Sequence, residues 1–365
     1  MNIPERMKAV LLTGHGGYDC LEYRNDVPVP KPEAGEVLVR VAAAGVNNTD
    51  INTRIGWYSK GVSDGTTSDS SEAGATGAQS DDASWSRNAL SFPRIQGADV
   101  CGEIVSVGEG IDAGRIGERV LIEPCLRADP AKQTFEFTYL GSECDGGFAQ
   151  YTKVSAQFAY KVNSDLSDAE LASFPCSYST AENLLSRSHV ANGDVILVTG
   201  ASGGVGSAAV QLAKRRGARV IAVASASKAH KVMALGADNV IPRGSNTLAA
   251  LGPKSVDVVI DLVAGPEWLD LLEVLVAGGR YATSGAIAGP MVELDVRTLY
   301  LKDLSLLGCT SLGPEIFQNL IGYIERGEIK PVVAQMFPLR DIAEAQDVFL
   351  SKKHTGKLVL IPPSD

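Results

Sequence analysis

Residues 194–214 read DVILVTGASGGVGSAAVQLAK, and this stretch decides the fold class of the chain. Its first part, Asp194–Gly200, is an apolar run typical of a buried strand, and a turn of small residues follows it. The next segment carries apolar residues at i, i+3, i+4 and i+7 counted from Val205, which predicts one apolar helix face. A strand, a glycine-rich turn and a helix in this order predict a dinucleotide-binding unit.

The turn itself holds the pattern Ala201-x-Gly203-x-x-Gly206, with alanine at the first position of the glycine fingerprint. Small residues let the backbone approach a pyrophosphate closely, and the start of the following helix offers free N–H groups. A glycine-rich turn without a ligand is the less favoured interpretation, because the strand and the helix flank the motif as it requires. The residues predicted to bind the cofactor are Ala201, Ser202, Gly203, Gly204, Val205 and Gly206.

Further strand signals continue the same pattern between about residues 162 and 310. The strands expected there are Ala218–Ala224, Asp238–Ile241, Val256–Val263, Gly279–Gly285 and Leu304–Cys309. Repeated βα units imply a parallel sheet with helices on both faces. We therefore expect a doubly wound α/β domain in this part of the chain.

The part of the chain before about Lys161 alternates short β-like runs with Gly and Pro, which predicts a mostly antiparallel β domain. Its clearest strands are Val37–Ala42, Gly102–Val107 and Glu118–Ile122. Beyond Ser311 the pattern predicts two helices and a last strand, at Glu315–Arg326, Leu339–Leu350 and Gly356–Ile361.

Residues 62–92 differ sharply in composition, being mostly Ser, Gly, Asp, Thr and Ala with almost nothing to bury. Such a segment cannot offset its ordering entropy through a core of its own. We favour a flexible surface insertion and keep open a lid over an active site, because long loops in compact domains are often functional. Trp57, Tyr58 and Trp85 would anchor the segment in either case.

Charge and composition exclude several classes of partner. The 365 residues include 33 basic and 43 acidic side chains, which gives a net charge of −10 at pH 7 and argues against nucleic acid or an anionic membrane. No basic-then-apolar N-terminal segment and no apolar run of about 20 residues occurs, so we expect a cytoplasmic protein. The six cysteines include no C-x-x-C pair and the four histidines are scattered, so no metal site is expected.

The end of the second strand of the α/β domain bears on the choice of cofactor. An NAD site usually has Asp or Glu there to hold the ribose 2′-hydroxyl, whereas this strand ends in Ser225 and Lys228 follows. Hydroxyl groups and a cation suit a 2′-phosphate, which a carboxylate would repel. Arg243, after the third strand, would supply a second cation. We therefore expect NADPH, although each cation alone is also an ordinary surface charge.

Taken together, these features resemble the medium-chain dehydrogenase/reductase superfamily over nearly the whole chain apart from residues 62–92. The supporting signatures are GEVLVRVAAAGVNNTD (35–50), FPRIQGADVCGEIVSVGEG (92–110), DGGFAQYTKV (145–154) and GEIKPVV…FPL…AQ…GKLVL (327–360). The resemblance implies a GroES-like catalytic domain of residues 1–161 and 311–365, with a Rossmann domain of residues 162–310 inserted and the active site between them. It also implies a homodimer, commonly joined through edge strands near Leu304–Thr310.

Zinc-dependent members of that superfamily hold their catalytic zinc with a Cys, the His of a Gly-His-Glu stretch, and a later Cys or Asp. Here the first position reads Asn47, the second reads Ala98, and only Cys176 matches. One thiol cannot form a site that needs three protein ligands. The structural zinc lobe is represented at most by Cys125, so both zinc ions are expected to be missing.

The pattern GVN-x-x-D followed by R-x-G-x-Y instead resembles the zinc-independent quinone oxidoreductase and enone reductase branch. Hydride delivery to such acceptors spreads charge into an enolate that hydrogen bonds can hold. The resemblance makes Asn47 and Tyr58 the candidates for that role, with Tyr58 or water as proton donor. Asp50 and Cys176 complete the candidate catalytic set, although Asp50 would more simply tie down the loop and Cys176 line the nicotinamide pocket.

The leading hypothesis is an NADPH-dependent, zinc-independent oxidoreductase that reduces a small-molecule quinone or α,β-unsaturated carbonyl. One alternative is an alcohol or aldehyde dehydrogenase of the same superfamily, with Cys176 and Asp99 in an unusual metal site. Another is a nucleotide-binding protein whose catalysis is vestigial.

Overall fold

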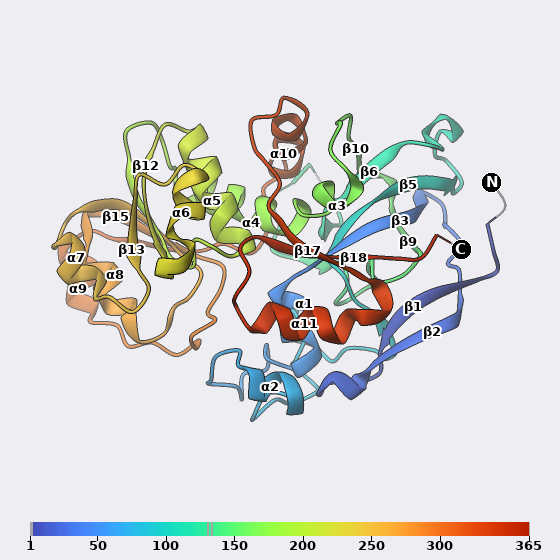
Figure 1. Ribbon diagram of the computed structural model, residues 1–365, viewed down its shortest axis with the longest axis horizontal. Helices are drawn as coiled ribbons and strands as arrows, with labels where there is room; N and C mark the ends of the chain where they lie inside the picture. Colours follow the sequence, from blue (N-terminus) through green and yellow to red (C-terminus); the bar gives the residue numbers. More distant parts are fainter. Residues whose placement is uncertain (1–2, 130, 133, 365) are drawn as a thin grey trace. The chain divides into compact units, whose positions relative to one another are not determined.

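The computed structural model describes residues 3–129, 131–132 and 134–364, and the chain divides into two compact units (Figure 1). Unit 1 comprises Met1–Val62, Thr66–Cys176 and Gly313–Asp365, and unit 2 comprises Ser63–Gly65 and Ser177–Leu312. No helix in the described part of the chain is long and apolar enough to cross a membrane.

Unit 2 is built on one parallel sheet of six strands in the order β13-β12-β11-β14-β15-β16. The strands are β11 (Val195–Val198), β12 (Arg219–Ala224), β13 (Asn239–Pro242), β14 (Val256–Asp261), β15 (Leu275–Thr283) and β16 (Ser305–Gly308). The chain starts at the centre of the sheet, runs to one edge, and returns to the centre before it runs to the other edge. This order confirms the predicted doubly wound Rossmann fold, whose ligands bind where the strand order reverses.

The helices of unit 2 lie before the first of these strands and between the others along the chain. They are α4 (Pro175–Arg187), which starts in unit 1, α5 (Gly204–Arg215), α6 (Ala229–Ala234), α7 (Thr247–Leu251), α8 (Trp268–Glu273) and α9 (Val296–Leu301). Of these, α5 packs against β11 and β12 through the apolar face that its sequence predicts.

Unit 1 contains a sheet in the order β10-β6-β5-β3-β18-β17, with β9 also paired to β3, and all pairs except β17–β18 are antiparallel. Its strands are β3 (Glu36–Val46), β5 (Asp99–Val107), β6 (Arg119–Ile122), β9 (Tyr151–Ser155), β10 (Ala159–Lys161), β17 (Val333–Pro338) and β18 (Lys357–Ile361). The smaller sheets contain β1 (Arg6–Leu12), β2 (Leu21–Pro28) and β4 (Arg94–Ile95), and β7 (Cys125–Arg127) with β8 (Phe137–Tyr139). This confirms the mostly antiparallel, GroES-like domain.

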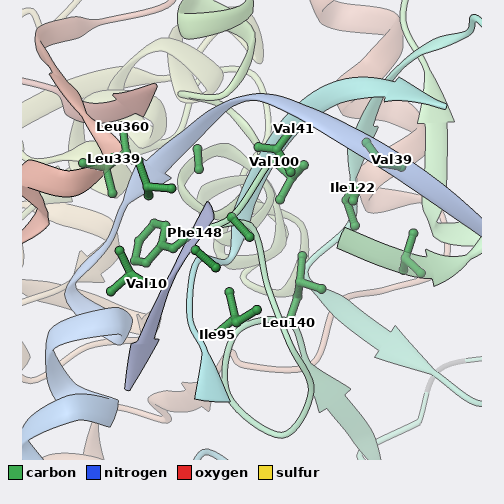
Figure 2. Packing of buried hydrophobic residues seen from close by; sticks show 14 of the residues in the cluster. Val10, Val39, Val41, Ile95, Val100, Ile122, Leu140, Phe148, Leu339 and Leu360 are labelled. Carbon is green, nitrogen blue, oxygen red and sulfur yellow. The ribbon is translucent and has the colours of Figure 1, made fainter. Parts of the chain in front are cut away.

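The core of unit 1 joins residues that lie far apart in the chain. Val10, Val41, Phe148 and Leu360 all belong to one buried cluster, shown in Figure 2. The C-terminal strand β18 lies in this core because it pairs with β3. The helices of unit 1 are α1 (Asn48–Ile55), α2 (Ser68–Ala73), α3 (Asp168–Leu171), α10 (Ile316–Glu325) and α11 (Ile342–Leu350).

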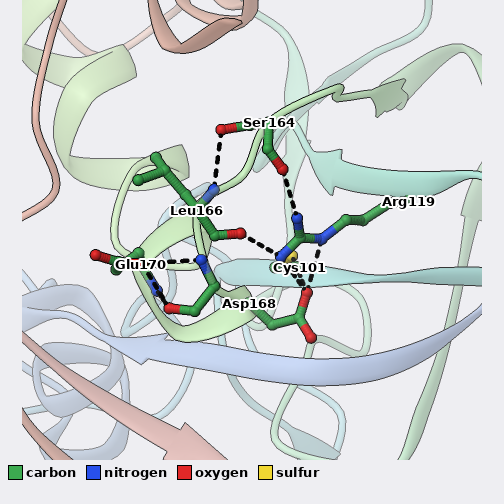
Figure 3. A network of polar contacts seen from close by, with 7 residues as sticks. Cys101, Arg119, Ser164, Leu166, Asp168 and Glu170 are labelled. Carbon is green, nitrogen blue, oxygen red and sulfur yellow. Dashed lines mark hydrogen bonds and ion pairs between the residues drawn. The ribbon is translucent and has the colours of Figure 1, made fainter. Parts of the chain in front are cut away.

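Unit 1 extends to Cys176, beyond the boundary at residue 161 that the sequence suggested. Two sets of contacts contribute: α3 packs on β3 and β5, and the Arg119 guanidinium donates to the Asp168 carboxylate and to the carbonyls of Ser164 and Leu166 (Figure 3). These bonds tie the segment before α3 to β6. A side-chain network of this kind leaves no periodic signal in the sequence.

The segment between Val62 and Phe92 buries more than its composition suggests. Ser71 is fully buried and receives hydrogen bonds from the buried Arg54 side chain at both its carbonyl and its hydroxyl oxygen. Ala83 and Ser84 are also fully buried, and α2 begins with Thr67 as its N-cap. A buried cation therefore anchors this segment at Ser71.

Candidate functional site

The glycine-rich turn of unit 2 follows β11 and leads into α5. Gly200 has a φ of 58°, in the left-handed region that favours glycine, and Gly203 is the N-cap of α5 without a side-chain cap. The N–H groups of the first helical turn have no intrahelical acceptor and suit an anion. A Cβ atom at Gly206 would lie 2.3 Å from the Gly200 carbonyl oxygen, so only glycine allows this close approach. These residues fit the pyrophosphate of a dinucleotide.

Cationic side chains gather beyond the end of β12, where the sequence predicted the site for a 2′-phosphate. Burial, Arg243 and Lys231 together hold the pKa of Lys228 below its ordinary value, so several cations lie near one another. The hydroxyl oxygens of Ser225 and Ser227 are 3.3 Å apart beside them. An anion at this place would relieve the repulsion between the cations.

A buried ion pair lies beside the predicted site residue Asn47 in unit 1. The side chains of Asp99 and Lys357 are 0% and 3% exposed, and the Lys357 ammonium lies 2.5 Å from Oδ2 of Asp99. The same oxygen accepts a hydrogen bond of 2.9 Å from Nδ2 of Asn47, whose Oδ1 accepts from Lys357. Oδ1 of Asp99 accepts from the backbone N–H of Cys176 at 2.5 Å. All three acceptor oxygens are therefore engaged within the protein.

Lys357 was not found by sequence reasoning, because its importance depends on strand register. Leu358 of β18 is paired with Val46 of β3, and Gly45 of β3 is paired with Asp99 of β5. Three neighbouring strands thus place Lys357, Asn47 and Asp99 side by side. The sequence signal was only a lysine at the start of an apolar strand.

The predicted residues Asn47 and Asp50 lie together at the start of α1 and form its capping box. The Asp50 carboxylate accepts from the backbone N–H of Asn47 at 2.7 Å. Burial raises the pKa of Asp50 to about 7, Asp99 adds to the rise, and the Lys357 charge opposes it. The amide protons of Asn47 point to Asp99 and, at 3.4 Å, to the Gly45 carbonyl. In this structure the Asn47 side chain therefore binds within the network, and its role as a donor to the substrate stays a prediction.

Tyr58 is positioned by a hydrogen bond to Thr49. Its hydroxyl lies 3.0 Å from Oγ1 of Thr49, which also accepts from Nε1 of Trp85 at 2.5 Å. Burial raises the pKa of Tyr58 well above its ordinary value, so its phenol keeps its proton. The Tyr58 hydroxyl donates to Thr49 and also has a side-chain hydrogen bond with Asn52, so its proton is engaged within the protein in this structure. Thr49 was missed by sequence reasoning.

Cys176 lies near Tyr139 and not beside a second thiol. Its sulfur is 3.2 Å from the Tyr139 hydroxyl, and burial together with Asp99 raises the pKa of Cys176 to about 12. The thiol is therefore neutral at physiological pH. Trp85, from the 62–92 segment, stacks on Tyr139 with ring centroids 4.3 Å apart and planes at 1°. Tyr58, Trp85 and Tyr139 thus form a cluster of aromatic side chains, and Cys176 contacts it through Tyr139.

The residues in unit 1 do not fit a divalent cation. Within the described ranges, no group of three or more His, Cys, Asp and Glu side chains is placed to hold a metal ion. Asn47 and Ala98 stand at two of the three positions considered for zinc, and the Lys357 ammonium lies against Asn47 and Asp99. A metal ion there would find Cys176 as the one side chain that matches the three zinc positions.

Comparisons with known proteins agree with this architecture. Residues 33–164 match the alcohol dehydrogenase GroES-like domain family, and residues 235–360 match the zinc-binding dehydrogenase family. Residues 196–271 match the NAD dependent epimerase/dehydratase family.

Similar proteins span the chain almost completely. The acryloyl-coenzyme A reductase of Metallosphaera sedula is 30% identical, over 97% of this chain and 99% of its own length. The quinone oxidoreductase of Rattus norvegicus is 30% identical, over 97% and 98% respectively. A solved structure from Sinorhizobium meliloti 1021, described as a candidate alcohol dehydrogenase, is 46% identical with a TM-score of 0.88 and covers 99% of this chain and 98% of its own.

Proposed function

Because the chain belongs to the medium-chain dehydrogenase/reductase superfamily of oxidoreductases, we propose that it reduces a quinone or an α,β-unsaturated carbonyl compound with NADPH and without a metal ion. The observation that carries this proposal is the buried Lys357–Asp99–Asn47 network, which occupies the place where a metal-dependent relative would need ligands. The names of two relatives support the acceptor class, since quinones and acryloyl thioesters are both conjugated carbonyl compounds.

The cofactor proposal rests on the two sites of unit 2. The turn around Gly203 and Gly206 would hold the pyrophosphate, and Ser225, Lys228 and Arg243 would hold the 2′-phosphate. When bound there, NADPH would supply the hydride for the reduction.

The side chains of unit 1 would donate hydrogen bonds to the carbonyl oxygen of the acceptor. Charge that develops on this oxygen needs a donor already in place. We assign this role to the Tyr58 hydroxyl, which would exchange its hydrogen bond to Thr49 for one to the acceptor. A phenol with a raised pKa donates a hydrogen bond but releases its proton reluctantly, so we assign the final proton to water.

The alcohol or aldehyde dehydrogenase alternative draws support from the similarity to the Sinorhizobium meliloti protein. In the form considered from sequence it needs Cys176 and Asp99 as metal ligands. Both Asp99 oxygens already accept hydrogen bonds, and among the described residues no third His, Cys, Asp or Glu side chain joins this pair in a metal-binding group. These contacts favour the reductase proposal.

An acceptor panel tests the proposal. Purified protein is mixed with NADPH or NADH and with enones, quinones or simple aldehydes, and loss of the absorbance of the reduced nicotinamide is followed. We expect turnover with NADPH and conjugated acceptors, and a decrease of roughly 100-fold in kcat for Tyr58→Phe, because one oxyanion donor is worth about that much. Tyr23→Phe, at an exposed tyrosine on β2, is the control and should be unchanged. Activity confined to aldehydes would favour the alternative, and NADPH binding without any turnover would favour a vestigial enzyme.

We also propose that the protein forms a homodimer through β16. This strand is the last in its sheet, and exposed apolar side chains lie on it and on the preceding helix, among them Leu306, Tyr300 and Leu301. Leu306→Lys should shift the mass measured by light scattering from dimer to monomer. Met336→Lys, at an exposed residue of β17 in unit 1, is the control. A monomeric wild-type protein would refute this proposal.

A further inference from the structure

We propose that Asp261 is a positioning residue for the nicotinamide half of the dinucleotide cofactor. Its carboxylate holds the backbone of residues 262–264 in place at the edge of the parallel sheet, and this backbone forms the binding surface beside the glycine-rich turn. The inference rests on the proposed dinucleotide site of unit 2, but it depends neither on the acceptor nor on the choice between NADPH and NADH.

The first observation is a buried carboxylate that is bound by neutral groups. Asp261 is 0% exposed. Its Oδ1 accepts hydrogen bonds from the Thr199 hydroxyl at 2.5 Å and from the backbone N–H of Val263 at 2.9 Å. Its Oδ2 accepts from the Tyr281 hydroxyl at 2.5 Å, and the backbone N–H of Ala264 donates to both oxygens, at 3.2 and 3.1 Å. A buried charge needs such bonds to offset the loss of its hydration.

The second observation is the place of this carboxylate in the sheet. Asp261 is the last residue of β14, Thr199 directly follows β11, and Tyr281 belongs to β15. These three parallel strands are neighbours in the sheet. The strand order reverses at β11, because β12 lies on one side of it and β14 on the other. The hydrogen bond from Thr199 to Asp261 thus spans the switch point, where dinucleotides bind in folds of this kind.

The positions proposed for the phosphates assign one half of the cofactor to this place. The turn after β11 would hold the pyrophosphate, and Ser225, Lys228 and Arg243, beyond β12 and β13, would hold the 2′-phosphate of the adenosine half. The other half of an extended dinucleotide would therefore run from the turn toward the carboxyl ends of β14 and β15. Residues 262–264 directly follow β14 at that end.

The backbone of this loop needs support. Ala264 has a φ of 53° and a ψ of −143°, in a region that residues with a Cβ atom rarely adopt. Asp261 fixes this conformation because it accepts from the N–H groups of both Val263 and Ala264. A Cβ atom at Gly200 would lie 3.3 Å from Cγ2 of Val263, so the loop packs directly against the glycine-rich turn. A change at Asp261 would therefore alter the surface for the nicotinamide half and leave the cations beyond β12 in place.

The test separates the two halves of the cofactor by titration calorimetry. NADPH contains both halves, whereas adenosine 2′,5′-bisphosphate lacks the nicotinamide half. We expect Asp261→Asn to weaken NADPH binding roughly tenfold, as the loss of hydrogen bonds to a charged group implies, and to leave the affinity for the bisphosphate unchanged. Asp257→Asn is the matched control, because Asp257 lies at the other end of β14, where it accepts from the Val195 N–H. Equal weakening of both ligands would overturn the proposal, as would an unchanged affinity for NADPH.

A second pair of variants keeps the proposal testable if Asp261→Asn does not fold. Thr199→Val removes the hydroxyl that donates to Asp261 and accepts from the Leu262 N–H, whereas Thr199→Ser keeps a hydroxyl at this position. We expect only Thr199→Val to lose affinity for NADPH, and neither variant to lose affinity for the bisphosphate. The proposal would be wrong if the two variants bound NADPH equally well.

These titrations need no turnover, so they separate the inference from the proposed function. NADH and adenosine diphosphate form a second pair of ligands, because the nicotinamide half is common to both cofactors. Binding of a dinucleotide without reduction of any conjugated acceptor would overturn the proposed function and leave the inference standing. A wild-type chain that binds neither dinucleotide would overturn both.

Discussion

At the scale of single residues, Asp50 shows how burial couples the candidate site to pH. In the folded chain its carboxyl keeps its proton up to about pH 7, whereas an unfolded chain loses that proton near pH 4. Between these values the folded state binds more protons than the unfolded state. The free energy of unfolding therefore falls as pH rises through this window, by at most about 1.4 kcal/mol per pH unit for this one group.

Asp50→Asn removes the titrating proton and keeps an oxygen that can accept from the Asn47 N–H. We expect the variant to show a shallower decline of the free energy of unfolding between pH 4 and pH 7, measured by urea denaturation at several pH values. Asp69→Asn, at an exposed position in α2, is the control and should leave the slope unchanged. A slope in Asp50→Asn equal to that of the wild type would contradict the assignment.

Single residues also show where sequence reasoning stops. Asn47 and Asp50 could be paired from the sequence because they are three positions apart at the start of a helix. Lys357 could not, since its contacts require the register of β18 on β3. The same limit applies to Thr49, whose importance comes from Trp85 in a segment without a clear pattern.

At the scale of elements, the 62–92 segment is held to unit 1 by one aromatic side chain as well as by Arg54. Trp85 stacks on Tyr139, contacts Tyr58 and Phe137, and donates to Thr49. Stacking and the indole hydrogen bond are separable contributions to this anchor. Trp85 therefore links the segment to the hydrogen-bonded pair of Tyr58 and Thr49.

Two substitutions at Trp85 separate these contributions. Trp85→Phe keeps an aromatic ring and loses the donor, which should cost about 1 kcal/mol of stability. Trp85→Ala loses both, which should cost about 2–3 kcal/mol and expose residues 62–92 to limited proteolysis. Chemical denaturation and the cleavage rate within the segment are the measurements. The anchor would be refuted if both variants were cleaved as slowly as the wild type.

The elements that sequence predicted well are those whose signal is local. β11, the glycine-rich turn and α5 follow one another directly along the chain. They carry both apolar periodicity and turn residues, as is typical of the start of a βαβ unit. β17 has no such signal, because four of its six residues are exposed and only Phe337 is buried, so no alternating pattern arises. α2 was missed because its stabilising partner, the Arg54 guanidinium, comes from α1.

At the scale of the whole molecule, the two units have different roles in the proposed reaction. Unit 2 has a glycine cradle and cations suited to a phosphorylated dinucleotide. Unit 1 has a buried ammonium–carboxylate pair and the hydrogen-bonded hydroxyl pair of Tyr58 and Thr49. The sequence predicted both domains and the loss of metal ligands at Asn47 and Ala98, while the cation in unit 1 required the folded strands.

The most direct measurement of the central claim is turnover by metal-free protein. The full chain is treated with a strong chelator, desalted and checked for metal by mass spectrometry, and the initial rate of NADPH oxidation is measured with an enone and a quinone. We predict that the rate equals that of untreated protein and that added zinc does not raise it. A rate that falls with chelation and returns with zinc would contradict the claim that this oxidoreductase works without a metal ion.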